Sequence, residues 1–125
     1  MTDVKVVDAS ALAAILFGEP EAEAVAARIG EARLVAPALL GFELANVCLV
    51  KCRRHPEQRD NLLAAFALRA RFGVEEIAIE HAEALALADA AGLTVYDASY
   101  LWLARRLDVP LVTLDKMLAR ADASR

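Results

Sequence analysis

The sequence is poor in residues that bind soft metals or form cross-links, with two cysteines and two histidines in 125 residues. Cys48 and Cys52 stand four positions apart, which places them on one face of a helix. Two thiols are too few for a zinc site without further ligands, so buried, reduced thiols are the expected state. The cysteine pattern therefore favours neither a zinc protein nor a disulfide-linked scaffold.

Long apolar runs and an excess of basic residues are also missing. No run approaches the roughly 20 apolar residues of a membrane-spanning helix, and residues 1–10 lack the features of a signal peptide. We therefore expect a cytoplasmic protein. With 14 basic and 18 acidic residues, the net charge is −4. This charge argues against a generally basic nucleic-acid binder, but not against a nucleic-acid enzyme whose acidic residues form a metal site.

Apolar sequence is abundant, at 58% of the residues. We expect one domain over residues 1–125, which is long enough to bury a core. Short apolar stretches typical of strands alternate with helical ones. The expected strands are 4–7, 33–37, 74–79 and 109–115, and the expected helices are 9–18, 19–32, 38–54, 55–73, 80–92, a helix within 93–108 after an extended lead-in, and 116–124. This alternation predicts an α/β domain with a largely parallel sheet.

Three aspartates stand where expected elements meet. Asp8 follows the first strand, and Asp115 follows the apolar stretch of the last one. Because the carboxyl ends of parallel strands share one edge of a sheet, we expect both side chains at that edge. Asp97 stands where an extended segment meets a helix. Each aspartate alone has a simpler explanation, since aspartate is among the best helix N-cap residues.

Glu43 is harder to explain by capping. It and Asn46 are the only strongly polar residues of the apolar segment 38–50, and their spacing places them on one helix face. We expect this helix to be buried on most sides. An unpaired carboxylate there would cost several kcal/mol or take up a proton. A narrow solvent-facing stripe is the alternative explanation.

Several carboxylates at one edge of the sheet would repel one another and titrate together. A divalent cation removes this penalty. Oxygen ligands without neighbouring histidine or cysteine favour Mg²⁺ or Mn²⁺ over zinc. Such a site commonly binds a phosphate-bearing substrate.

Three segments together resemble the PIN-domain ribonucleases, and specifically the VapC-type toxins of type II toxin–antitoxin pairs. They are VVDASALAAILFGEPEA, APALLGFELANV and GLTVYDASYLWLARRLDVPLVTLDKML, in the order and spacing of the family. The resemblance implies a three-layer α/β/α fold around a central, mostly parallel sheet of about four strands. Family members usually carry one more strand after the last helix. No apolar run is left for it here, so we expect that edge strand to be missing.

The resemblance also implies the site. The catalytic and metal-binding acids fall on Asp8, Glu43, Asp97 and Asp115. The supporting polar residues behind them fall on Ser10, Asn46 and Thr113. The two hydroxyl groups are expected to orient the metal ligands. In this family the TVY segment before Asp97 is an extended lead-in to a helix and not a strand of the sheet.

The function implied is metal-dependent endoribonuclease activity with Mg²⁺, or Mn²⁺, as cofactor. The implied partners are RNA such as tRNA or rRNA, a VapB-type antitoxin that occludes the site, and a second copy of the chain in a homodimer. Lys116 and Arg120 are the candidate contacts to the RNA backbone, although such charges are more often simply solvated.

Two other functions remain open. A phosphoacceptor receiver-like signalling domain is also a parallel α/β domain that binds Mg²⁺ through aspartates. It needs an acceptor aspartate after its third strand, where this chain has Glu80 and His81. The other alternative is a non-catalytic PIN domain that binds RNA or antitoxin without cutting.

Overall fold

The computed structural model describes residues 3–124, and its centre is a sheet of four strands. They are β1 Val4–Val7, β2 Arg33–Pro37, β3 Glu75–Ile77 and β4 Leu111–Val112. Their order is β3-β2-β1-β4, and every pairing is parallel. The predicted parallel α/β sheet is therefore confirmed.

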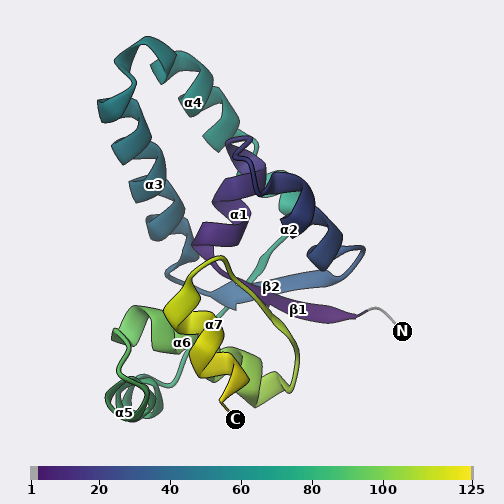
Figure 1. Ribbon diagram of the computed structural model, residues 1–125, viewed down its shortest axis with the longest axis vertical. Coiled ribbons are helices and arrows are strands. Elements are labelled where there is room, and N and C mark those ends of the chain that lie inside the picture. The colour runs from purple at the N-terminus through teal and green to yellow at the C-terminus, as the bar shows by residue number, and fades with distance from the viewer. Residues whose placement is uncertain (1–2, 125) are drawn as a thin grey trace.

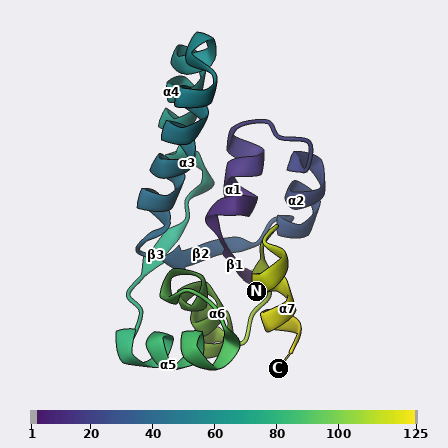
Figure 2. The ribbon, with the colours of Figure 1, turned by 60° about the vertical axis from the view of Figure 1, so that its left-hand side comes forward.

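Helices cover both faces of the sheet, as Figures 1 and 2 show. One layer contains α1 Ala9–Leu16, α2 Ala22–Ile29, α3 Leu40–Arg54 and α4 Arg59–Ala67, and the other contains α5 His81–Ala91, α6 Val95–Leu107 and α7 Lys116–Ala123. Two short 3₁₀ helices, η1 Pro56–Gln58 and η2 Arg69–Phe72, flank α4. This is the expected three-layer α/β/α arrangement.

The two helical layers explain why the strands are apolar without alternation. Val6 and Val7 are neighbours on β1 and point to opposite faces, yet both are fully buried. A central parallel strand covered on both sides has this pattern. Leu12 of α1 and Leu101 of α6 are among the buried side chains of the same core cluster.

The expectation that the helix over 38–54 is buried on most sides is wrong, because α3 is buried on one face only. Its buried residues Leu40, Leu44, Cys48 and Cys52 recur every fourth position and so form one narrow face. Phe42, on another face, is 84% exposed. The α3–α4 pair extends away from the sheet (Figures 1 and 2), so only one side of α3 has the domain to pack against. Both cysteines are free and buried, as expected.

Three expected elements also differ from the structure in their extent. The helix expected over 55–73 is interrupted, and the chain turns at Gly73 in the left-handed region, with φ of 61°. The expectation that the TVY segment is an extended lead-in is wrong, because α6 already begins at Val95 and Thr94 is its N-cap. The last strand is only two residues long, and within residues 3–124 no further strand follows α7. β4 is thus an edge strand of the described sheet.

None of the helices within residues 3–124 has both the length and the apolar character needed to cross a bilayer.

Helix α7 offers a direct test of the core. Leu118 is 0% exposed, whereas the preceding residue, Met117, is 60% exposed. We expect Leu118→Ala to lower the free energy of unfolding by about 2–4 kcal/mol, because it leaves a cavity in the core. Met117→Ala, the matched control, should change it by less than about 0.5 kcal/mol. Urea unfolding measures both, and equal effects would contradict the packing of α7.

Candidate metal centre

Four acidic side chains stand at the beginnings of four helices. Asp8 is the N-cap of α1 and follows β1, while Asp115 is the N-cap of α7 and comes shortly after β4. Glu43 and Asp97 lie in the first turns of α3 and α6. The N-terminal end of a helix carries partial positive charge, which favours carboxylates there. The fold therefore gathers negative charge where four helix dipoles partly offset it.

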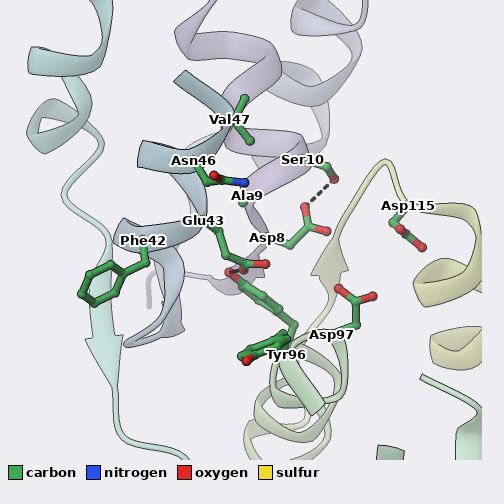
Figure 3. Close-up of a pocket in the computed structure, with 11 residues that line it drawn as sticks. Asp8, Ala9, Ser10, Phe42, Glu43, Asn46, Val47, Tyr96, Asp97 and Asp115 are labelled. Carbon is green, nitrogen blue, oxygen red and sulfur yellow. Dashed lines mark hydrogen bonds between the residues drawn. The ribbon is translucent and has the colours of Figure 1, made fainter. Parts of the chain in front are cut away.

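These carboxylates line one cavity of about 420 Å³. Figure 3 shows Glu43 on one side of it and Asp115 on the opposite side, with Asp8 and Asp97 between them. The remaining lining residues are Ala9, Ser10, Phe42, Asn46, Val47, Tyr96 and Tyr100. The structure thus brings together all four predicted acids, together with the predicted Ser10 and Asn46.

Asp8 is the most deeply held of the four, being only 5% exposed. Its Oδ1 accepts hydrogen bonds from Ser10 Oγ at 2.7 Å and from the Ala11 amide at 3.0 Å. Its Oδ2 accepts a short hydrogen bond from Thr113 Oγ1. The carboxylate is therefore fixed by residues from both ends of the chain.

The same hydroxyl groups hold the segment that carries Asp115. The Leu114 amide donates to Ser10 Oγ at 3.0 Å, and the Asp115 amide donates to Thr113 Oγ1 at 3.0 Å. Thr113 is buried and Asp115 is exposed. The β1–α1 and β4–α7 junctions are thereby joined into one polar network with Asp8 at its centre.

Glu43 is positioned by a residue that sequence reasoning did not assign to the site. Tyr100 is 1% exposed, and its hydroxyl donates to Glu43 Oε1 at 2.5 Å. Burial, followed by the contact with Glu43, raises the pKa of Tyr100, so the phenol keeps its proton and remains the donor. The available signal was its position three residues after Asp97, on the same helix face.

Helix capping explains two of the four acids in part. Asp8 accepts from the Ala11 amide, and Asp115 accepts from the Leu118 amide at 2.9 Å. In α6 the capping acceptor is Thr94 Oγ1, which accepts from the Asp97 amide at 3.1 Å. Capping therefore does not account for Asp97, and it does not account for Glu43.

Burial is the main cause of the raised pKa values in this cluster. Burial raises the pKa of Asp8, and the charge of Asp115 raises it further. The hydrogen bonds from Thr113, Ala11 and Ser10 lower this pKa, but by less. Burial also raises the pKa of Glu43, which Tyr100 lowers and the charges of Asp97 and Asp8 raise. Burial is also the largest cause of the raised pKa of Asp97, followed by the charges of Asp115 and Asp8. The carboxylates therefore repel one another across the cavity.

The chemistry of the donors fits Mg²⁺ or Mn²⁺, because the cavity offers carboxylate, hydroxyl and amide oxygens and no histidine or cysteine. In the part of the chain described, no three acidic, histidine or cysteine side chains are close enough together to hold one ion. Asp115 is exposed and Asp97 half-buried, so their side chains are freer to turn than that of Asp8. The donor set fits a hard divalent cation, and side-chain rotation is needed to close it.

The two predicted RNA contacts lie outside the cavity. Lys116 and Arg120 are exposed on α7, directly after Asp115 and one turn further along. Two exposed aromatic residues were missed at its rim, Phe42 and Tyr96. Phe42 precedes Glu43 directly and Tyr96 precedes Asp97, so their neighbourhood in the sequence was the available signal.

The chain is a parallel α/β/α domain in which four helices begin with acidic residues around one cavity. These features define a PIN-like class of protein. The model of the family described as PIN domain matches residues 5–124. The chain is similar to Ribonuclease VapC3 from Pyrobaculum aerophilum, with 34% identity over 123 residues and 91% of each chain covered. It therefore belongs to the PIN-domain family, as a protein of VapC type.

The fold agrees with a solved structure. The crystal structure of PAE2754 from Pyrobaculum aerophilum matches with a TM-score of 0.67, covering 97% of this chain and 87% of that one. At 24% sequence identity, this likeness supports the fold alone.

The raised pKa of Glu43 predicts a dependence of stability on pH. The folded state binds the proton of Glu43 more tightly than the unfolded chain, so this group's contribution to stability is lost as pH rises from the ordinary glutamate pKa through the raised one. Glu43→Gln removes the charge and keeps an acceptor oxygen for Tyr100. We expect a melting temperature about 2–4 °C above wild type at neutral pH in EDTA, with the difference vanishing near about pH 4.

Calorimetric or fluorescence melting measures this difference. The matched control is Glu31→Gln, an exposed glutamate in the turn after α2, which should leave the melting temperature unchanged at both pH values. A Glu43→Gln protein that is less stable than wild type at neutral pH would show that the Glu43 charge is stabilising in the folded state.

Proposed function

We propose that this chain is a divalent-metal-dependent endoribonuclease and the toxin of a toxin–antitoxin pair. The observation that carries the proposal is the meeting of four carboxylates at four helix starts around one cavity. The name of the relative, Ribonuclease VapC3, supports RNA as the substrate class. Membership of the PIN-domain family supports the same class of function.

In this proposal Asp8, Asp97 and Asp115 bind one or two Mg²⁺ or Mn²⁺ ions, with Glu43 as a further ligand. A bound cation supplies positive charge that binds phosphate oxygens and offsets the charge that develops on them during hydrolysis. The chain's own residues set the geometry. Ser10 and Thr113 hold the Asp8 carboxylate, and Tyr100 fixes the Glu43 side chain at the rim of the cavity. Asn46 is a polar neighbour of Glu43 in that rim.

The proposed RNA and antitoxin partners rest on the relationship to PIN-domain and VapC proteins. We propose that Lys116 and Arg120, exposed on α7 beside Asp115, contact the RNA backbone. The RNA is a tRNA or rRNA in this proposal, and cleavage takes place in the cytoplasm. A VapB-type antitoxin inhibits the enzyme by covering the cavity and its carboxylates.

The exposed aromatic rim supports a homodimer. Phe42 is 84% and Tyr96 is 65% exposed, which is unusual for large aromatic side chains. Tyr96 also borders a second, mostly apolar hollow of about 430 Å³, lined in part by Leu39, Ile79 and Val95. Because a protruding aromatic ring and an apolar hollow lie close together on one face, two copies related by a twofold axis can each place Phe42 against the other's hollow.

A cleavage assay tests the enzyme. We expect purified wild type to cut RNA with Mg²⁺ or Mn²⁺ and to lose activity in EDTA. Asp8→Asn and Asp97→Asn should each lower the rate by about 100-fold or more, since each removes a charge that the cation requires. Asp60→Asn, an exposed aspartate in the first turn of α4, is the matched control and should cleave like wild type.

Several outcomes separate this function from the others. Equal cleavage by wild type and both aspartate variants would show that the assignment of the site is wrong. RNA binding without cleavage by any variant would indicate a non-catalytic PIN domain. Incorporation of phosphate from acetyl phosphate would favour the receiver-like function.

The dimer contact has its own test. Phe42→Asp puts a charge into the proposed apolar contact, so we expect analytical ultracentrifugation to show the monomer at concentrations where wild type is dimeric. Leu63→Asp, at a 44% exposed position on α4, is the matched control and should remain dimeric. A dimer that survives Phe42→Asp would place the contact on another face.

A further inference from the structure

The outer edge of β4 is capped by an arginine from α2. On its inner side β4 pairs with β1, through bonds from the Val6 amide to the Pro110 carbonyl at 3.0 Å and from the Asp8 amide to the Val112 carbonyl at 3.2 Å. Successive carbonyls of an extended strand point to opposite sides. The carbonyls of Leu111 and Thr113 therefore face the outer edge, where no strand of residues 3–124 pairs with β4.

Arg28 donates hydrogen bonds to both of these outward-facing carbonyls. Its Nη1 donates to the Thr113 carbonyl at 2.9 Å, and its Nη2 donates to the Leu111 carbonyl at 3.4 Å. The end of α2 that carries it is in turn tied to the sheet, because Lys5 Nζ on β1 donates a short hydrogen bond to the Arg28 carbonyl. One side chain thus occupies the positions that a further strand would otherwise fill.

The residue held most closely by Arg28 is central to the acidic site. Thr113 donates its hydroxyl proton to Asp8 and accepts from the Asp115 amide. Its backbone carbonyl is bound by Arg28, so Thr113 is fixed from both its side chain and its main chain. Movement of this residue would shift the Asp8 carboxylate and the start of α7 together.

We propose that Arg28 is a positioning residue: by capping the outer edge of β4, it fixes the segment 113–115 that delivers Thr113 and Asp115 to the acidic cavity. Its effect on cation binding rests on the proposed function, whereas its effect on the backbone does not. Arg28 lies on α2, does not line the cavity and acts only through the residues it holds.

Amide hydrogen exchange, followed by NMR without divalent cation, tests the positioning directly. We expect Arg28→Met to accelerate exchange of the Leu114 and Asp115 amides by about 3- to 10-fold relative to the amides of the sheet strands. Arg28→Lys keeps one donor group and should restore part of the protection. Arg69→Met is the matched control, since Arg69 Nη1 also donates to a carbonyl, that of Phe66, at 3.0 Å. It should leave both amides unchanged.

A second measurement links the segment to the site. In RNA cleavage, Arg28→Met should raise the Mg²⁺ concentration for half-maximal rate by about 3- to 10-fold, while the KM for RNA stays near that of wild type. Unchanged exchange at residues 114 and 115, or equal acceleration throughout the sheet, would overturn the proposal. Local acceleration in a protein whose wild type does not cleave RNA would support the positioning role and reject the proposed function.

Discussion

Repulsion among carboxylates is the constraint on which the site depends. Asp8, Glu43 and Asp97 each have a raised pKa, first through burial and then through one another's charge or that of Asp115. The fold offsets part of this cost by placing all four at helix starts, where backbone amides and the helix dipole favour negative charge. What remains is unbalanced negative charge that a compact divalent cation would offset, which is the physical basis for the proposed Mg²⁺ or Mn²⁺ site.

The polar groups around the acids form two separate supports. Ser10 and Thr113 join the β1–α1 and β4–α7 junctions around Asp8. Tyr100 joins α6 to α3 through Glu43. Asp8 and Glu43 each accept a hydrogen bond from a hydroxyl group of another segment, which fixes these two carboxylates, whereas Asp115 is exposed.

Much of the site could be predicted from sequence, for reasons that differ between residues. Asp8 and Asp115 follow apolar strands of a parallel sheet, so their shared edge follows from topology. Glu43 stands out in the sequence through its apolar surroundings, although α3 is buried on one face only; the structure places its carboxylate at the cavity. Tyr100 and Arg28 were not predicted, because their partners lie 57 and 85 residues away and only tertiary packing joins them. The early start of α6 depends on its N-cap Thr94, and the region around α4 is interrupted by short 3₁₀ turns; apolar periodicity reports neither feature.

Anomalous X-ray scattering from crystals grown with Mn²⁺ would test the central claim most directly. The account predicts one or two Mn²⁺ peaks in the cavity, bound by carboxylate oxygens of Asp8, Asp97 and Asp115, with Glu43 at or next to the coordination shell and still bonded to Tyr100. Mn²⁺ bound only elsewhere on the protein, or a cavity without Mn²⁺ at saturating concentration, would contradict it.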